Sequence, residues 1–496
     1  MYKTQTIVIK NEHQLFPYCE FITSRANNMY NTTLFRMRQV MTGLSKEVHK
    51  RHPNEVEVLN ELENTLPHMK SKYHMPTKDK WMMSAKFLHN FMHVSKNPDY
   101  YADGFPRQTA QRMITAACQD MSNFFASLRV YNENPSAFNG KPKLPGYKKS
   151  GGNCTVSISN QECVIKTDKF GRKYIKFPKT KSICYIADGT CDLVEVEIKP
   201  YYDCYKVCIV TDDKCQVPEP SIVPTRIISI DLGVSNLAAI TNNIGKECLL
   251  FKGGVVKSVN QWYNKQMAMI MSEQTIGSTE KFKPTEESQK LAMHRDNCMR
   301  DYFHKVAKHI IKWCQDNQID TIVIGENKGW KQDVNIGKTN NQNFVQIPFN
   351  KLKWYIQYRA EALGINVIYQ DEAYTSKASF LDNDMIPNNK DDASSPVFSG
   401  KRAPTRYKGM YKTGGFRGLY QSKDGTIINS DLNGSANIGR KAIPTMFENG
   451  IQPNFDDVAI FVHPDQNKIK QNQEQQKSQY KPSKSKQRRD NRKRAS

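Results

Sequence analysis

Hydrophobic positions in the second half of the chain follow first a strand pattern and then a helix pattern. From residue 226, the runs RIISIDLG, NLAAITNN and ECLLFKGG are apolar and lie at hairpin spacing, which predicts three consecutive strands. Helical spacing follows in SVNQWYNKQMAMIMS and in LAMHRDNCMRDYFHKVAKHIIKWCQDN, where one face carries Phe303, Val306, Ile310 and Trp313. This half therefore begins with hairpin-connected strands and continues with helices.

Two more strands and a helix complete the pattern. TIVIGEN predicts a buried strand, IPFNKLKWYIQYRAEALG a helix with Pro348 in its first turn and Gly364 at its C-terminal cap, and INVIYQDE the next strand. A last helix follows Asp431. The order β-β-β-α-β-α-β-α is that of the α/β RNase H-like fold. A purely parallel nucleotide-binding fold would not begin with hairpins, and the sequence has no phosphate-binding glycine loop of P-loop or dinucleotide type.

The first half of the chain combines helices with short strands. Helical spacing recurs between residues 12 and 133, which predicts a helical region. Residues 134–220 contain short strand patterns separated by Pro and Gly, and an opening strand in residues 1–11 is expected to join them in a small β-barrel or sheet. The Pro-rich stretch CQVPEPSIVPT then predicts a linker before the second domain.

The charge of the chain points to a polyanionic partner. Among 496 residues, 72 Lys and Arg face 49 Asp and Glu, which gives a net charge of +23. The last 20 residues hold only nine of these basic residues, so the excess is not confined to the terminus. Nucleic acid is the expected partner, because its phosphates would neutralise such a surface.

The remaining composition indicates a cytoplasmic protein. The start MYKTQTIVIK lacks the apolar core of a signal peptide, and no run of 18 apolar residues suggests a membrane span. The 12 Cys are expected to be reduced thiols. Those in the strand patterns lack CxxC pairs and are predicted to be buried rather than zinc ligands, namely Cys184, Cys191, Cys204, Cys208 and Cys215.

Three acidic residues occupy positions that this fold would bring together. Asp231 ends the first strand, Glu326 ends TIVIGE, and Asp431 precedes the last helix. Carboxylates that lie close together repel one another unless divalent cations neutralise them. We therefore predict a site for two Mg²⁺ ions, with Mn²⁺ as a substitute, that hydrolyses phosphodiester bonds. Each acid taken alone is equally consistent with a strand-end or helix-cap carboxylate, and Gly233 with a tight turn.

The segments around these acids resemble the three RuvC blocks of the TnpB family and of the related type V CRISPR effectors. The blocks are SIDLGVSNLAAITNN, IVIGENKGWKQ and INSDLNGSANIGRK. Further segments also resemble TnpB, namely NNMYNTTLFRMRQV, KPKLPGYKKSGGN, NIGKTNNQNFVQIPF and EAYTSKASFLDND. Together the similarity runs from about residue 5 to residue 445.

This resemblance implies an RNA-guided DNA endonuclease. Asp231, Glu326 and Asp431 would be the catalytic Mg²⁺ ligands of a RuvC-like nuclease domain, expected over residues 226–374 and 429–445. Residues 1–11 and 134–220 would form the β-barrel wedge domain, and residues 12–133 an inserted helical recognition domain. The partners would be a guide RNA and double-stranded target DNA beside a short protein-read motif. The protein would then be associated with the bacterial nucleoid, as a monomer or an asymmetric dimer.

Basic and aromatic residues of the first half are candidate nucleic-acid contacts, because cations bind phosphates and aromatic rings stack on bases. They occur in FRMRQV and in KPKLPGYKK. The residues chosen are Arg36, Arg38, Lys141, Lys143, Tyr147, Lys148 and Lys149. A solvated surface or a core aromatic is the alternative for each of them.

The sequence departs from the family between the second and third blocks. TnpB proteins typically carry a CxxC…CxxC zinc ribbon there, whereas this chain has no Cys or His between Glu326 and Asp431. Residues 375–428 are therefore predicted to form a zinc-less insertion that loads the target strand and is held by packing. Arg406 and Arg417 are its candidate phosphate contacts. Residues 446–496 are expected to be a basic, disordered tail.

Other functions remain consistent with parts of this pattern. An RNA-guided DNA-binding repressor would share the fold but have lost the acids, which are present here. A transposase or junction resolvase with an RNase H-like fold would work without RNA and would not need the basic N-terminal half. TnpB and the miniature type V effectors differ in the genetic source of their RNA, which is encoded outside this chain.

Overall fold

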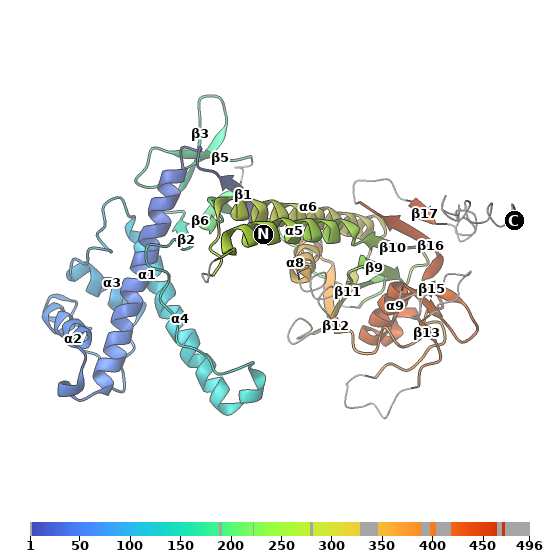
Figure 1. Ribbon diagram of the computed structural model, residues 1–496, viewed down its shortest axis with the longest axis horizontal. Helices are drawn as coiled ribbons and strands as arrows, with labels where there is room; N and C mark the ends of the chain where they lie inside the picture. The colour runs from blue at the N-terminus through green and yellow to red at the C-terminus, as the bar shows by residue number, and fades with distance from the viewer. Residues whose placement is uncertain are drawn as a thin grey trace. The chain divides into compact units, whose positions relative to one another are not determined.

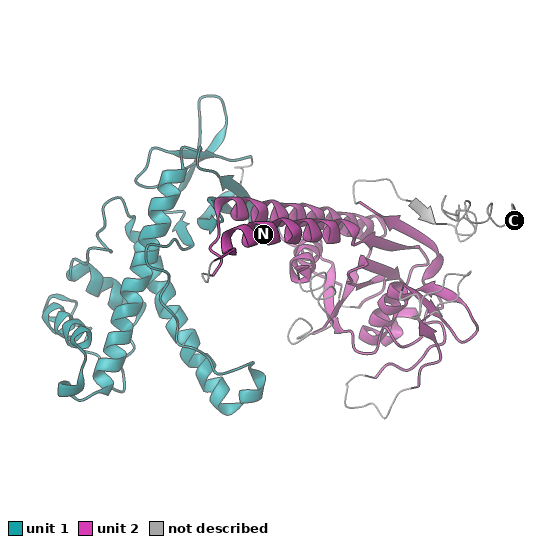
Figure 2. Ribbon diagram, viewed as in Figure 1, with its two compact units in different colours: residues 1–215 teal, residues 216–496 magenta. Residues whose placement is uncertain are grey.

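The computed structural model describes residues 2–187, 191–221, 223–277, 281–327, 346–387, 397–402, 418–463 and 469–471 (Figure 1). They belong to two compact units, residues 1–215 and 216–496 (Figure 2). The change from one unit to the other falls in the predicted Pro-rich linker.

The helices of the first unit confirm the predicted helical region. They are α1 (Phe16–Ser45), α2 (Pro53–Thr65), α3 (Ala85–Val94) and α4 (Arg107–Glu133). Helix α1 buries apolar residues at helical spacing, among them Ile22, Met29 and Leu34, against the other helices. The helices and strands of this unit share one hydrophobic core, because Ile22 and Leu34 belong to the same buried cluster as Val196 and Ile198.

The strands of the first unit form two sheets. They are β1 (Tyr2–Ile9), β2 (Val156–Ser159), β3 (Val164–Thr167), β4 (Lys173–Lys176), β5 (Ile183–Tyr185), β6 (Asp192–Tyr201) and β7 (Cys204–Asp212). The opening strand does join the later ones, in the order β1-β7-β6-β2, while β3-β4-β5 is a separate three-stranded sheet. Among the described strands, no ladder closes these sheets into the predicted barrel.

The second unit is built on a mixed seven-stranded sheet. Its strands are β8 (Ile227–Asp231), β9 (Asn236–Asn242), β10 (Glu247–Lys252), β11 (Thr321–Glu326), β12 (Asn366–Asp371), β16 (Asn454–Phe461) and β17 (Ile469–Gln471). The order is β12-β11-β8-β9-β10-β16-β17. Strands β8, β9 and β10 are antiparallel neighbours, whereas β11 is parallel to both β8 and β12. The three hairpin strands and the two later strands therefore pair as the RNase H-like order predicts.

Helices cover both faces of this sheet. The helices are α5 (Gly254–Thr275), α6 (Glu286–Asp316), α8 (Phe349–Glu361) and α9 (Ser430–Ala442). Ile230 and Ile324 share a core with Phe303 of α6 and Ile356 of α8. On the other face, Ile227 and Val323 pack with residues of α9 and the turn after it, Ile438 and Met446. The alternation along β8 and β11 thus assigns Asp231 to the face that α9 covers.

The end of the sheet corrects one expectation. Residues 454–461 were predicted to lie in a disordered tail, but they form β16, which pairs with β10 in parallel. The run from Val458 to Phe461 is buried, and the Phe461 ring stacks on Phe251 with centroids 4.7 Å apart. The basic composition of the terminus conceals this short apolar run. The tail prediction is therefore wrong for residues 454–461.

No described helix is long and apolar enough to cross a membrane. Among the strand cysteines, Cys184, Cys204 and Cys208 are buried as predicted, whereas Cys191 is half-buried and Cys215 is exposed. Cys215 lies at the last position of the first unit, beyond the end of β7, so the sheet does not cover it.

Candidate functional site

The carboxyl ends of adjacent strands bring the predicted acids to one edge of the sheet. Asp231 is the last residue of β8 and Glu326 the last of β11. These two strands are parallel and pair Ile230 with Ile324, so Asp231 is level with Gly325. Asp431 lies in the first turn of α9, whose N-cap Asn429 accepts hydrogen bonds from the Asp431 and Leu432 amides. A helix N-terminus favours an anionic side chain at that position.

A fourth carboxyl group, which the sequence analysis missed, joins this edge. Glu372 follows β12 directly, and its amide donates to the Glu326 carbonyl at 3.2 Å. Burial, opposed by Lys353 and reinforced by Asp371 and Glu326, raises the pKa of Glu372 to about 7. The only sequence signal was its position one residue beyond the end of a buried strand.

The carboxylate of Asp231 is repelled by the neighbouring acids Glu372 and Asp431. Burial, followed by the charges of Glu372 and Asp431, raises its pKa well above the usual range, and Arg402 lowers it. Carboxylates that disfavour each other's ionised forms mark a place where a cation would be bound. This electrostatic state connects Asp231 to both Glu372 and Asp431.

Two lysines face the acids from different elements. Lys353 of α8 is nearly buried, and its Nζ lies 3.9 Å from Glu326 Oε1. Burial lowers the pKa of Lys353, while Glu326 and Glu372 act in the opposite direction. Lys252 donates to Asn236 Oδ1 at 2.9 Å, and Asn236 Nδ2 donates to Asp431 Oδ2 at 2.8 Å. Lys353 thus contacts Glu326 directly, whereas Lys252 is linked to Asp431 through the Asn236 side chain.

Glycines leave room for the carboxylates. A Cβ atom at Gly434 of α9 would lie 2.7 Å from Asp231 Oδ2. A Cβ atom at Gly325 would lie 2.8 Å from Glu372 Cγ and closer still to Glu372 Oε1. The carboxylate oxygens here are the ligands that hard divalent cations prefer. One of them, Glu372 Oε1, is buried and accepts no hydrogen bond from any described residue. Within the described ranges, no three Asp, Glu, His or Cys side chains already stand at metal-ligand spacing.

The glycine at position 434 gives a testable consequence. We expect Gly434→Ala to reduce any metal-dependent cleavage by about a hundredfold, because a displacement of about 1 Å in a reacting group has that effect. The fold should be retained, since Ala favours a helix over Gly by about 1 kcal/mol. Cleavage rates and thermal midpoints would be compared with those of Gly254→Ala, a helical glycine in α5 with open space around its Cβ position. Equal cleavage by both variants would contradict the prediction.

Buried hydrogen bonds fix α9 over the sheet. Ser435 Oγ donates to the Ser229 carbonyl at 2.7 Å and lies 3.0 Å from Thr241 Oγ1. Asn433 and Asn437 donate to the Ala378 carbonyl at 2.8 and 2.7 Å. The polar residues of the motif DLNGSANIG therefore anchor the helix that presents Asp431.

The two candidate arginines of α1, Arg36 and Arg38, make different contacts in the structure. Arg36 donates to Glu61 of α2 through Nε at 3.1 Å and Nη2 at 3.0 Å, and its side chain is 15% exposed. These donors already join two helices, so the predicted nucleic-acid contact at Arg36 is disfavoured. Arg38 donates to the Pro145 carbonyl and lies 4.7 Å from the centroid of the Tyr147 ring.

The segment containing the candidate lysines is docked on α1. Asn31 bonds both the amide and the carbonyl of Lys148, at 2.8 and 2.9 Å, and Asn27 donates to the Lys149 carbonyl at 2.9 Å. Its backbone is thus held in place while many of its side chains face outward. The exposed candidates are Lys141, Lys143, Tyr147 and Lys149, whereas Lys148 is half-buried with its amine 4.2 Å from the Tyr30 ring centroid.

Part of the predicted insertion can be placed. Strands β13 (Lys401–Arg402), β14 (Leu419–Gln421) and β15 (Ile427–Asn429) form a small sheet. Tyr420 is buried there and donates to the Lys377 carbonyl at 2.7 Å, which is packing of the predicted kind. Arg406 and Arg417 lie outside the described residues. Arg402, which was not predicted, lies close enough to Asp231 to lower the pKa of that residue.

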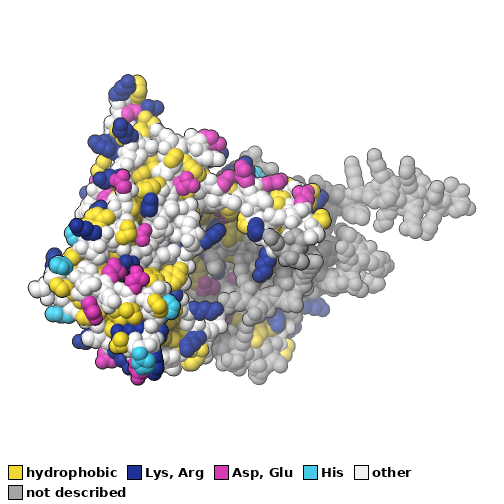
Figure 3. Space-filling view, turned by 60° about the vertical axis from the view of Figure 1, so that its left-hand side comes forward, with side chains coloured by type: hydrophobic (Ala, Val, Ile, Leu, Met, Phe, Trp, Pro, Cys, Tyr) yellow, Lys and Arg dark blue, Asp and Glu magenta, His cyan; other side chains and the backbone are white. Residues whose placement is uncertain are grey.

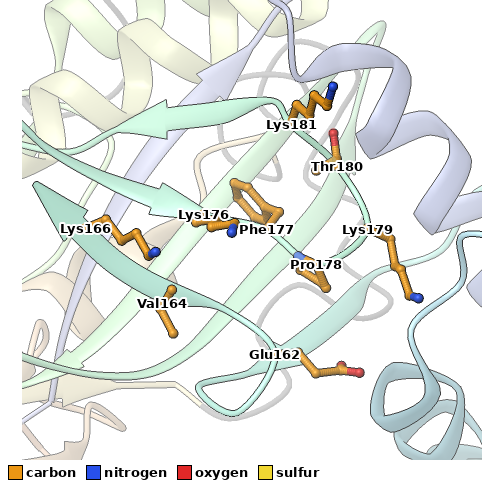
Figure 4. Close-up of a pocket in the computed structure, with 9 residues that line it drawn as sticks. All are labelled: Glu162, Val164, Lys166, Lys176, Phe177, Pro178, Lys179, Thr180 and Lys181. Carbon is orange, nitrogen blue, oxygen red and sulfur yellow. The ribbon is translucent and has the colours of Figure 1, made fainter. Parts of the chain in front are cut away.

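A basic pocket in the first unit was also missed. It has a volume of about 550 Å³, and four of its lining residues are Lys166, Lys176, Lys179 and Lys181 (Figure 4). Phe177 also lines the pocket; it is buried and its ring packs against Tyr18, with centroids 5.7 Å apart. Lys and Arg side chains gather at the upper tip of this unit, where Figure 1 labels β3 and β5 (Figure 3). The signal in the sequence was the repeated lysine in YIKFPKTKS.

Comparison with known proteins shows what the chain is similar to. A family model, OrfB_IS605, described as "Probable transposase", matches residues 207–331, which include Asp231 and Glu326. A curated relative, the TnpB-like protein ORF457 of Acidianus two-tailed virus, is 25% identical over 225 residues. That match covers 44% of this chain and 42% of the relative. The resemblance to TnpB that the three motifs indicate is thereby confirmed.

Solved structures of larger complexes are also similar to the chain. The Cas12f1–sgRNA–target DNA complex has a TM-score of 0.42 and 12% identity, covering 85% of this chain and 82% of that one. C2c1 of Alicyclobacillus acidoterrestris, in complex with single-guide RNA, has a TM-score of 0.37 and 9% identity, covering 84% of this chain and 70% of that one.

Proposed function

We propose that this protein is an RNA-guided DNA endonuclease whose cleavage site contains Asp231, Glu326 and Asp431. The observation that carries the proposal is the position of Asp231, a half-buried carboxyl at the edge of the sheet whose ionised form is disfavoured by Glu372 and Asp431. Such repulsion disfavours the fold unless a cation relieves it. The resemblance to TnpB supports a nuclease as the purpose of that cation.

The roles of the residues follow from their contacts. Divalent cations, when bound, activate water for attack on phosphorus and offset the charge of the leaving oxygen. Asp231 and Asp431 would hold them from β8 and α9, with Asn236 orienting Asp431 by its 2.8 Å hydrogen bond. Lys353 keeps Glu326 at the same edge from α8. A guide RNA would supply target specificity by base pairing.

The test is reconstitution of guided cleavage. The full-length protein would be expressed with its flanking DNA, and co-purifying RNA would be sequenced. A plasmid matched to that RNA would then be incubated with the complex and Mg²⁺. RNA of defined length and guide-dependent cutting are the expected results. Target binding without cutting would indicate a repressor, and cutting without any specific RNA would indicate a resolvase or transposase.

The basic pocket is a candidate phosphate-backbone contact within this function. We expect the double variant Lys166→Gln and Lys176→Gln to weaken RNA binding by about tenfold at moderate salt and to reduce the salt dependence of binding, since fewer counterions are released. Lys308→Gln with Lys312→Gln is the matched control, because it removes the same charge from exposed positions of α6. Affinities would be measured at several salt concentrations; equal losses in both double variants would remove the pocket from the interface.

A further inference from the structure

Glu372 is placed between two acids that come from different faces of the sheet. Ile324 of β11 packs in the core covered by α6 and α8. Glu326 lies two residues further along the strand, so its side chain extends from that same face. Asp231 begins on the face covered by α9, where Gly434 adjoins it. Glu326 is paired with Asp371 in the β11–β12 ladder, so Glu372 is the next residue at the same edge.

The Glu372 side chain crosses β11 toward Asp231. It lies over Gly325, where a Cβ atom would meet its Cγ at 2.8 Å and its Oε1 closer. Gly325 is level with Asp231 in the parallel ladder, because the preceding residues Ile324 and Ile230 are paired. The carboxyl group thus lies over β11, beside Ile438 of α9, on the same face of the sheet from which the Asp231 side chain extends.

One oxygen of this carboxyl group is buried without a donor. Glu372 Oε1 is enclosed, and no group in the described part of the chain donates a hydrogen bond to it. Such an oxygen costs about 1–3 kcal/mol unless another partner takes the place of the donor. Among the charged neighbours of Asp231, Glu372 raises its pKa more than Asp431 does. Glu326 in turn raises the pKa of Glu372.

We propose that Glu372 is a fourth carboxylate ligand of the divalent-cation site, placed between Asp231 and Glu326. The position of the side chain over Gly325 and its unpartnered oxygen carry the inference. It rests on the proposed function, because it assigns a further ligand to that same site. Mg²⁺ and Mn²⁺ both accept carboxylate oxygens, so either ion suits this position.

The test measures Mn²⁺ binding directly. Full-length wild-type protein and the variants Glu372→Gln, Glu361→Gln and Asp231→Asn would be titrated with Mn²⁺ alone, and free Mn²⁺ would be followed by electron paramagnetic resonance. Glu361 is an exposed residue of α8 and serves as the matched control. We expect Glu372→Gln to weaken Mn²⁺ binding by about tenfold to a hundredfold, with no loss of thermal stability in EDTA. Glu361→Gln should bind as the wild type does.

The outcomes separate this inference from the proposed function. Wild-type affinity in Glu372→Gln, with loss of binding in Asp231→Asn, would overturn the fourth ligand alone. A lower thermal midpoint of Glu372→Gln in EDTA with unchanged Mn²⁺ affinity would show a structural role and would also overturn it. Saturable Mn²⁺ binding that survives in Asp231→Asn, or its absence in the wild type, would overturn the proposed metal centre itself.

Discussion

Replacement of Asp231 by alanine is expected to reduce Mg²⁺-dependent DNA cleavage by about a thousandfold or more, the scale on which central catalytic groups act. Asp231 is half-buried at the carboxyl end of β8, and the charges of both Glu372 and Asp431 raise its pKa. Its removal would take a ligand from the centre of the cluster. Single-turnover cleavage of a guide-matched plasmid measures the effect.

Loss of folding could also lower cleavage by Asp231→Ala, and thermal stability distinguishes the two causes. Because burial and like charges disfavour ionised Asp231, its removal should leave the thermal midpoint in EDTA unchanged or higher. Asp316→Ala is the control, since it removes an exposed carboxylate paired with Lys312 at the end of α6. Cleavage by Asp231→Ala at the rate of Asp316→Ala would contradict the assignment, whatever the stability of the two variants.

The elements that position Asp231 and Asp431 could be predicted because their patterns are local. A buried strand of β-branched residues ending in an acid is legible in RIISID, and three such runs at hairpin spacing imply antiparallel pairing. The structure confirms this order in β8, β9 and β10. A helix at Asp431 was likewise expected from local pattern; it begins one residue earlier, at Ser430, with Asn429 as its N-cap.

Contacts that depend on register between distant strands were not predictable. Glu372 reaches the site because β12 pairs with β11 in a register that places Asp371 beside Glu326. Nothing in the spacing from Glu326 to Glu372 encodes that register, since the β11–β12 connection contains a helix. Arg36 shows the converse: a basic residue in an aromatic-rich helix resembles a nucleic-acid contact, but its partner Glu61 lies on α2.

Two glycines of the motifs, Gly325 and Gly434, also depend on contacts with distant segments. In IVIGE and DLNGS, a glycine can be attributed to a turn from sequence, yet both lie inside regular elements. Gly325 adjoins Glu372 and Gly434 adjoins Asp231, so each glycine is required by a carboxylate from another segment. Each glycine leaves space for a carboxylate from another segment, and this contact is evident only in the folded structure.

The pKa of Glu372 leads to a pH-dependent difference in stability without metal. Its folded-state pKa of about 7 exceeds its ordinary value of 4.5, so the folded protein binds more protons between these limits. Its contribution to stability is then fully present below about pH 4.5 and is lost as pH rises through 7. Glutamine stays uncharged, so Glu372→Gln in EDTA should lie within about 1 kcal/mol of the wild type at pH 5. At pH 8 it should be more stable by up to about 3 kcal/mol, or about 6–12 °C in midpoint.

Comparison at each pH isolates this group from others that titrate nearby. Asp231 and the lysines facing Glu372 and Asp431, Lys353 and Lys252, remain in both proteins, so most of their effects cancel in the difference between midpoints. The exposed substitution Glu361→Gln should show no such difference at either pH. Mg²⁺ at pH 8 should raise the wild-type midpoint more than that of Glu372→Gln, because a bound cation relieves the repulsion that the substitution has already removed. A difference between wild type and Glu372→Gln that stays constant from pH 5 to pH 8 would show that the Glu372 carboxyl is ionised throughout this range.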